Sequence, residues 1–142
     1  MFGRKRVKPR HLNSLADLKS LVAEGKPVLI EFMRAGCRNC SIMDGIVSEL
    51  AEEYGDSACV VKIDVGRVAD AVGTFMVKAT PTFLLFGRPA VPAAKKKAKR
   101  QPGPVPERAD RSPVARWRAS GLVRKDQIAR ALESAGAVRV EG

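Results

Sequence analysis

Cysteine and polar aromatic residues are scarce in this chain of 142 residues, which holds three cysteines, one histidine, one tryptophan and one tyrosine. A domain of this length buries a core without disulfide bridges, so the cysteines are not the framework of a small secreted scaffold. A zinc site needs about four ligands. Beside Cys37 and Cys40 the chain offers only Cys59 and His11, without a second CxxC or an HxxxH, so a zinc site is not expected.

Long apolar runs are also missing. The longest, such as residues 28–30 and 82–86, are far shorter than the roughly 18 residues that span a bilayer. The basic N-terminus leads into HLNSLADLKS, which lacks the apolar stretch of about 7 to 15 residues of a secretory signal. We therefore expect no membrane span and a cytoplasmic, reducing location, where a cysteine pair indicates metal binding or redox activity before structural cross-linking.

The net charge of +11 is concentrated in two segments. Residues 1–10 hold five basic residues and no acid, and residues 88–118 hold ten basic residues and two acids. The rest of the chain has 11 basic and 13 acidic residues, so it is nearly neutral. This distribution argues against a uniformly cationic nucleic-acid-binding domain.

The segment 88–118 also differs in composition. It holds six of the nine prolines and the run AAKKKAKR, and it has almost no large apolar residue except Trp117. Such a segment buries too little apolar surface to offset its ordering entropy, so we expect a largely disordered loop. The chain is therefore divided into a basic N-terminal arm, residues 1–10, and one domain, residues 11–142, which the basic insertion interrupts.

The hydrophobic pattern alternates between helices and strands. Ser14 with Asp17 starts an amphipathic helix that ends near Gly25. Short apolar or β-branched runs predict buried strands. The expected strands are 28–33, 59–65, 80–87 and an edge strand at 117–121, and the other expected helices are 38–54, 68–75 and 125–135. This alternation predicts an α/β sheet covered by helices.

The motif Cys37-Arg38-Asn39-Cys40 lies where a buried strand meets the start of a helix. The free N–H groups and the dipole of a helix N-terminus favour a thiolate, and Arg38 and Arg34 add positive charge beside Cys37. These features favour Cys37 as the attacking nucleophile. Cys40, one turn further along, is then placed to attack the mixed disulfide and release the partner. A redox-silent pair is the alternative.

The sequence around this motif resembles the thioredoxin family. The resemblance covers about residues 12–87 and 115–136 and includes four features in the family's order. They are Glu31 six residues before Cys37, Lys62 in VVKID, Thr80-Pro81-Thr82 at the start of FLLF, and Gly121 before LVRKDQIARAL. The resemblance implies a thioredoxin fold, a central mixed β-sheet flanked by helices, with the basic insertion between its last two strands.

The resemblance also implies a role for each of these residues. Glu31 is implied as a buried proton acceptor and donor for Cys40, with a pKa raised by burial and moderated by Lys62. A carboxylate that reaches solvent at the end of the sheet is the alternative. Pro81 is expected to be cis, and the backbone of Thr80 to pair with an extended substrate segment. The implied catalytic residues are Cys37, Cys40, Glu31 and Lys62, and the substrate-binding residues Gly36, Arg38, Thr80, Pro81 and Gly121.

Three features depart from the family's pattern. Gly36 replaces the tryptophan before the first cysteine, Arg38-Asn39 replaces Gly-Pro, and Gly45 replaces the proline five residues after the second cysteine. Substrate preference therefore does not transfer from the family. Arg38 is expected to stabilise the reduced thiolate and to make the disulfide more oxidising than one that encloses Gly-Pro.

These observations predict a thiol-disulfide oxidoreductase that acts on protein disulfides through Cys37 and Cys40. We expect a monomer that needs no metal or organic cofactor, and the resemblance implies an electron donor of the flavin/NADPH thioredoxin-reductase type. The alternative is a thioredoxin-fold binding module that docks on nucleic acid or another polyanion through its basic arm and insertion, with the cysteines structural or regulatory.

Overall fold

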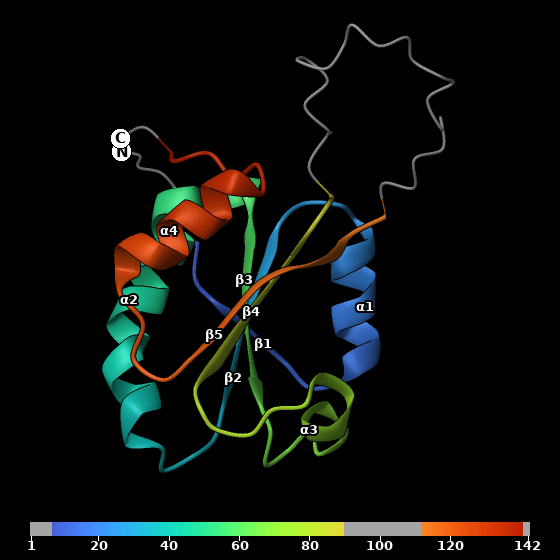
Figure 1. The fold of residues 1–142 in the computed structure, drawn as a ribbon, viewed down its shortest axis with the longest axis vertical. Coiled ribbons are helices and arrows are strands. Elements are labelled where there is room, and N and C mark those ends of the chain that lie inside the picture. The colour runs from blue at the N-terminus through green and yellow to red at the C-terminus, as the bar shows by residue number, and fades with distance from the viewer. Residues whose placement is uncertain (1–6, 90–111, 141–142) are drawn as a thin grey trace, which may run out of the picture.

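The computed structural model of the protein describes residues 7–89 and 112–140, which form a central sheet with helices on both faces (Figure 1). The strands are β1 (Arg10–Leu12), β2 (Val28–Met33), β3 (Cys59–Asp64), β4 (Thr82–Gly87) and β5 (Val114–Ser120). The helices are α1 (Leu15–Ala23), α2 (Arg38–Tyr54), α3 (Asp70–Phe75) and α4 (Lys125–Ser134), with a short 3-10 turn at Gly55–Ser57. Every predicted helix and strand is present, and β1 precedes them at the sheet edge.

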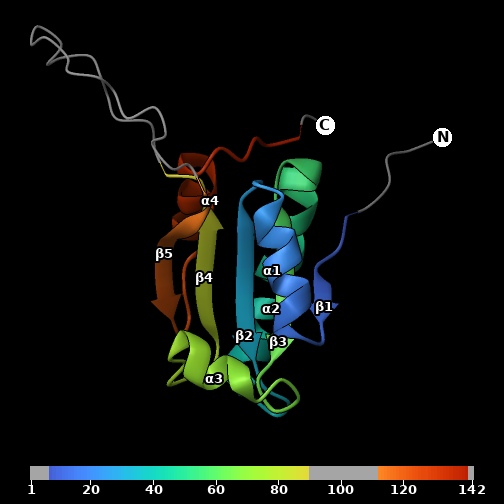
Figure 2. The same cartoon turned by 90° about the vertical axis from the view of Figure 1, so that its right-hand side faces the viewer.

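The sheet is mixed, in agreement with the prediction. Its strand order is β1-β3-β2-β4-β5 (Figure 2). Strands β1, β3 and β2 run parallel, β4 is antiparallel to β2, and β5 is antiparallel to β4. The register places Glu31 of β2 between Lys62 of β3 and Phe83 of β4, in the middle of the sheet. Glu31 therefore lies on a central strand, where an ionised carboxylate is far from water and energetically unfavourable.

Each face of the sheet is covered by two helices, α1 and α3 on one side and α2 and α4 on the other (Figure 1). Successive side chains of a strand point to opposite faces. In β2, Ile30 and Phe32 pack in the core under α1 and α3, whereas Leu29 packs in the core under α2 and α4. Glu31 shares the face of Leu29 by this alternation, so its carboxyl group lies on the side covered by α2.

The start of α1 is the predicted cap. Ser14 has extended backbone, and its hydroxyl oxygen accepts a hydrogen bond from the Asp17 backbone N–H at 3.1 Å. This bond satisfies one of the free donors at a helix N-terminus. Leu18 and Leu21 then point into the core beneath the helix.

The last strand begins earlier than predicted, which corrects the boundary of the 88–118 insertion. Residues 114–118 belong to β5, with Val114 opposite Gly87 and a bulge between Leu85 and Phe86. Trp117 packs against the core under α2 and α4. The arginines on either side of it make the segment look like a polar loop in the sequence, so its start was not predicted as a strand. The predicted disorder falls mainly on residues 90–111, which lie outside the described residues.

Arg10 is also reassigned, because it pairs with Val61 in the sheet rather than belonging to a separate arm. Residues 1–6 of the predicted arm lie outside the described residues. Within residues 7–89 and 112–140, no helix has the length and apolar character needed to cross a bilayer.

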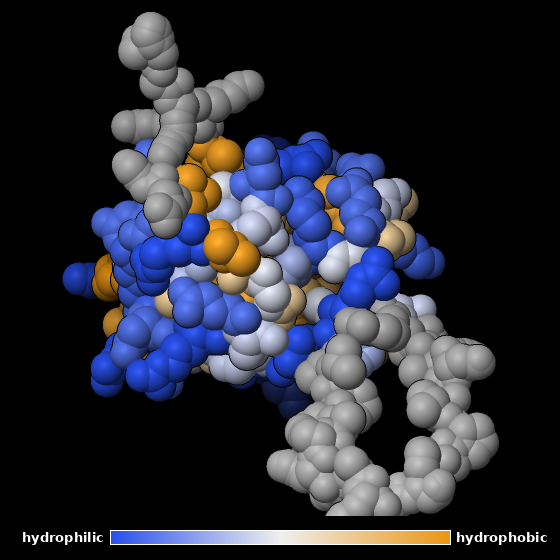
Figure 3. All heavy atoms as spheres, turned by 90° about the horizontal axis from the view of Figure 1, so that it is seen from above, coloured by the Kyte–Doolittle hydropathy of each residue, from blue (hydrophilic) through white to orange (hydrophobic). Residues whose placement is uncertain are grey.

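The two ends of the sheet carry different features. The start of α2, helix α3 and the turn between β5 and α4 lie at the lower end of the molecule (Figure 1). The end of β4 and the start of β5, which flank the insertion, lie at the upper end. Figure 3 looks onto this upper end, where hydrophilic side chains surround small hydrophobic patches. The cysteine motif is therefore at the opposite end of the sheet from the residues that flank the basic insertion.

Candidate active site

Cys37 and Cys40 form a disulfide at the N-terminus of α2. Cys37 is the N-cap residue, and its Sγ accepts a hydrogen bond from the Cys40 backbone N–H at 3.1 Å. Cys37 is partly exposed, whereas Cys40 is only 3% exposed. The sulfur of Cys37 is therefore the one that a partner reaches, and it lies where the helix dipole favours negative charge.

The loop before β4 reaches the disulfide. The Thr80–Pro81 peptide bond is cis, as predicted, and the Thr80 carbonyl oxygen lies 3.5 Å from Cys37 Sγ. The backbone N–H of Gly121 donates to the Pro81 carbonyl oxygen at 2.8 Å, and Gly121 has φ +85°, a conformation that favours glycine. The structure thus places Thr80 beside Cys37 and Gly121 against Pro81, as the resemblance implies.

The residues on either side of Cys37 are exposed. Gly36 has φ +83°, and a Cβ built there meets no atom within 4 Å. Backbone conformation rather than crowding therefore favours glycine at this position. Arg38 is the first residue of α2, so its positive charge is fixed within one residue of the reactive sulfur. Both residues lie at the predicted site.

Glu31 is a buried acid. Its side chain is 1% exposed, and neither carboxylate oxygen has a hydrogen-bond partner. Burial raises the pKa of Glu31 from 4.5 to about 7, the positive charge of Lys62 lowers it, and the negative charge of Asp44 raises it. The alternative of a carboxylate in solvent is therefore wrong. A carboxyl group with a pKa near neutrality is suited to both proton uptake and proton release.

Lys62 bonds to Asp44 more closely than to Glu31. Its Nζ lies 2.6 Å from Asp44 Oδ1 and 3.9 Å from Glu31 Oε1. Asp44 follows Cys40 by four residues on α2, so the two side chains occupy the same face of the helix. Asp44 is not among the residues predicted from the sequence, although its spacing from Cys40 is a signal that points to it. Asp44 and Lys62 thus connect the helix that carries Cys40 to the buried carboxyl group.

Arg118 is a second residue near the site that was not predicted from the sequence. Its Nη1 and Nη2 donate to the carbonyl oxygens of Phe75 and Met76, each at 2.8 Å. These carbonyls lie at the end of α3, where backbone acceptors lack partners within the helix and positive charge is favourable. Arg118 therefore ties β5 to the start of the loop that leads to Thr80. Nothing in the sequence distinguishes it from the other arginines of its segment.

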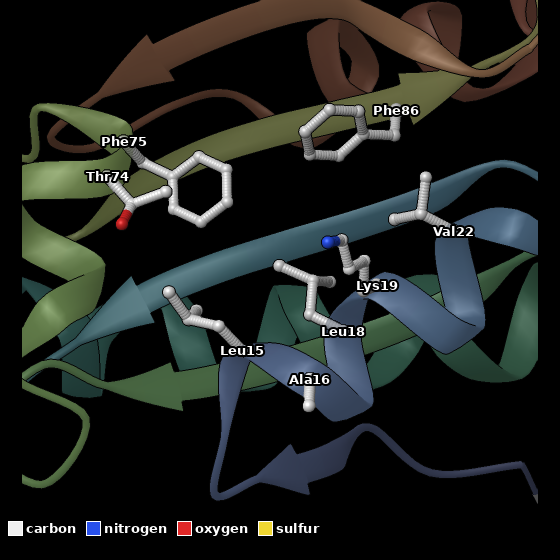
Figure 4. Close-up of a pocket in the computed structure, with 8 residues that line it drawn as sticks. All are labelled: Leu15, Ala16, Leu18, Lys19, Val22, Thr74, Phe75 and Phe86. Atoms are coloured by element: carbon white, nitrogen blue, oxygen red, sulfur yellow. The ribbon is translucent and has the colours of Figure 1, made fainter.

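An apolar hollow lies away from the disulfide, between α1, α3 and β4 (Figure 4). Its volume is about 520 Å³. It is lined by Leu15, Ala16, Leu18, Lys19, Val22, Thr74, Phe75 and Phe86. This hollow is on the sheet face opposite Glu31 and contributes no group to the site.

Among the described residues, no cluster of three or more His, Cys, Asp or Glu side chains is suited to hold a metal ion.

Replacing Glu31 with glutamine is expected to stabilise the protein at alkaline pH. The raised pKa means that the folded chain keeps a proton that the unfolded chain releases between pH 4.5 and about 7, so stability falls as pH rises through this range. Glu31→Gln removes that loss, which amounts to about 3 kcal/mol at full extent. Urea unfolding at about pH 4 and about pH 8 measures it. Glu24→Gln, which replaces an exposed acid at the end of α1, serves as control. It should show the wild-type difference in unfolding free energy between the two pH values.

A gain for Glu31→Gln that is the same at both pH values would contradict a buried carboxyl group that titrates near neutrality.

Replacing Asp44 with asparagine is expected to lower the pKa of Glu31. The substitution removes a negative charge that raises this pKa and deprives Lys62 of its nearest anionic partner, so the positive charge acts more fully on Glu31. A carbon-13 NMR titration of the Glu31 carboxyl group measures the change. Asp56→Asn removes an exposed acid beyond the other end of α2 and should leave the titration where it is in the wild type. An unchanged or raised pKa in Asp44→Asn would show that Asp44 does not act on Glu31.

Comparison with known proteins finds a matching family model and similar individual proteins. A protein-family model described as Thioredoxin matches residues 11–103. Thioredoxin Y2, chloroplastic, of Arabidopsis thaliana is 36% identical over 80 residues, which are 56% of this chain and 47% of that protein. Thioredoxin of Alicyclobacillus acidocaldarius is 33% identical over 76 residues, which are 52% of this chain and 72% of that protein. The chain spans about half the length of the chloroplast relatives that it matches.

Solved structures agree with the sequence relatives. A mutant thioredoxin from Halobacterium salinarum NRC-1 superposes with a TM-score of 0.68 at 22% identity, over 96% of this chain and 98% of that one. Thioredoxin of Malassezia sympodialis superposes with a TM-score of 0.69 at 16% identity, over the same shares. These likenesses confirm the predicted thioredoxin fold. Because the family model covers more than half of the residues and agrees with the site around Cys37 and Cys40, the chain belongs to the thioredoxin family.

Proposed function

We propose that this protein is a thiol-disulfide oxidoreductase that exchanges its Cys37–Cys40 pair with disulfides of other proteins. The observation that carries the proposal is the combination of a partly exposed sulfur at a helix N-terminus with a buried carboxyl group of near-neutral pKa under the same helix. Membership of the thioredoxin family supports it. The reaction requires only the two cysteines and protons, so no metal or organic cofactor is included.

The first step is an attack by the reduced protein. The thiolate of Cys37, favoured by the N-terminus of α2 and by Arg38, attacks one sulfur of the substrate disulfide. A bond forms between Cys37 Sγ and that sulfur, the substrate disulfide breaks, and the other substrate sulfur leaves as a thiolate that takes a proton from water. The product is a mixed disulfide between Cys37 and the substrate.

The second step releases the substrate. Cys40 transfers its proton toward the Glu31 carboxylate, and its sulfur attacks Cys37 Sγ. The Cys37–Cys40 disulfide forms, and the second substrate sulfur leaves and becomes a thiol. The two cysteines have then given two electrons to the substrate. Cys40 suits this intramolecular step because it is buried and is not in competition with solvent thiols.

Backbone groups beside the disulfide are suited to hold the substrate. Thr80 is partly exposed beside the disulfide, in the bend that precedes β4. An extended substrate segment that pairs with Thr80 would place its own cysteine beside Cys37 through main-chain hydrogen bonds. Gly36 and Gly121 have no side chain, so they leave room for this segment.

The proposal also covers the electron donor, the location and the oligomeric state of the protein. A reductase of the thioredoxin-reductase type is proposed as the electron donor, and the protein is proposed to act as a cytoplasmic monomer. The alternative of a polyanion-binding module gains no support from the family or its relatives. Of the 15 basic residues in the arm and the insertion on which that alternative rests, ten lie in residues 1–6 and 90–111, outside the described residues.

Cysteine substitutions test the proposed exchange. With dithiothreitol as the source of electrons, the wild-type protein is expected to accelerate insulin reduction, and Cys37→Ser is expected to abolish the acceleration because the attacking sulfur is lost. Cys40→Ser should accumulate a mixed disulfide that mass spectrometry detects as an adduct on Cys37. Cys59→Ser is the control, because Cys59 is the free cysteine at the start of β3, and it should react like the wild type.

Equal reduction rates for the wild type and Cys37→Ser would overturn the proposed function.

A further inference from the structure

The exposed charges next to the disulfide are of one sign. Arg34 lies in the loop before Cys37, Arg38 begins α2, and Lys78 lies in the loop before Thr80. All three side chains are exposed, and within the described residues none of them forms an ion pair. We call Arg34, Arg38 and Lys78 the cationic rim.

Backbone contacts fix the rim close to the reactive sulfur. The Arg34 carbonyl oxygen accepts a hydrogen bond from the Cys37 N–H at 3.2 Å, so the loop turns back tightly before the disulfide. Arg38 is the neighbour of Cys37. Lys78 precedes Thr80 by two residues, and the carbonyl oxygen of Thr80 lies 3.5 Å from Cys37 Sγ. A segment bound across the disulfide therefore passes the rim.

Acidic side chains near this end of the sheet do not pair with the cationic rim. Asp44 is bonded to Lys62, and Asp126 is bonded to Arg124. Asp64, at the end of β3, accepts a hydrogen bond from the Gly66 backbone N–H and is only half-exposed. The loops 34–37, 76–81 and 121–124 contain no acid at all. Asp70, at the start of α3, is a further exposed acid at this end. Within the described residues, no acid forms an ion pair with Arg34, Arg38 or Lys78.

Exposed apolar side chains accompany the rim. Met76 is 66% exposed at the end of α3, Leu122 is 57% exposed after Gly121, and Ile42 is 53% exposed on α2. Ile42 follows Arg38 by four residues, so these two share one face of the helix. A partner that covers the disulfide meets this apolar surface together with the positive charges of the cationic rim.

We propose that the cationic rim selects acidic substrates: segments whose disulfide is flanked by Asp or Glu, with apolar residues that cover Met76 and Leu122. This inference rests on the proposed exchange reaction and adds its substrate class. Complementary charge accelerates encounter and positions a partner, and salt weakens both effects. Segments flanked by Lys or Arg are disfavoured because they bring like charges together at the disulfide.

Three synthetic peptides test the inference. They share one sequence and one internal disulfide, and the flanking positions carry Glu, Gln or Lys. Stopped-flow kinetics gives the second-order rate constant with which each peptide oxidises the reduced full-length protein. At about 10 mM ionic strength, where charges act over ~30 Å, the Glu peptide is expected to react at least about tenfold faster than the Lys peptide. At about 1 M salt, where they act over ~3 Å, the ratio should approach one.

Charge-reversal variants test whether the difference in rate between the Glu and Lys peptides depends on the cationic rim. The double variant Arg34→Glu and Lys78→Glu is expected to abolish or invert the Glu-to-Lys rate ratio at low salt. Because the ratio compares two peptides with the same variant, an effect of Arg34 on the Cys37 thiolate cancels; Arg38, the direct neighbour of Cys37, is left unchanged. The matched control is Lys19→Glu with Arg130→Glu, two exposed positions on α1 and α4 that change the net charge by the same amount. This control should retain most of the wild-type ratio.

The outcomes separate the two proposals. If the Gln peptide is not reduced at all, the exchange reaction itself fails. If the Gln peptide is reduced but the low-salt ratio for the wild type is near one, the acidic substrate class is wrong and the exchange reaction stands. If both double variants change the ratio equally, net charge rather than the cationic rim is responsible, and the inference is overturned.

Discussion

The carboxyl group of Glu31 lies in the interior without a hydrogen-bond partner, and the arrangement of the site depends on this burial. An ionised carboxylate in such surroundings is costly, so its proton is held until the pH reaches about 7. Lys62 offsets part of that cost from 3.9 Å away, but it is bonded at 2.6 Å to Asp44. At neutral pH the Glu31 carboxyl group is therefore about half ionised. Burial raises its pKa, and Lys62, which is shared with Asp44, limits that rise.

The sheet supplies the geometry that makes this burial useful. A central strand carries Glu31 toward the layer covered by α2, and the same strand leads directly into the loop before Cys37. The cis bond before Pro81 and the hydrogen bond from Gly121 bring two more loops to the same end. The described flanks of the long insertion lie at the other end of the sheet, away from these loops (Figure 1). Loop closure costs rise only slowly with length, which is why such an insertion is tolerated.

The sequence predicts the parts of the site that depend on order along the chain. Cys37, Cys40, Glu31, Pro81 and Gly121 have the spacing of a known family, and the structure places them as that spacing implies. Asp44 was missed because its role depends on how α2 packs over β3, which is a tertiary contact. Arg118 was missed because its partners are backbone carbonyls more than forty residues away. The early start of β5 was hidden because its anchoring tryptophan stands among arginines and prolines that indicate a loop.

The most direct test of a buried proton acceptor is the pH dependence of the resolving step. A single-turnover reaction of the reduced protein with one equivalent of an aromatic disulfide separates the thiol released by Cys37 from the thiol released by Cys40. In the wild type the second release should accelerate with the ionised fraction of Glu31, with a midpoint near pH 7. In Glu31→Gln it should lose this inflection and slow by about a hundredfold at the midpoint. The same rate and pH profile in both proteins would contradict a role for Glu31 in moving the proton of Cys40.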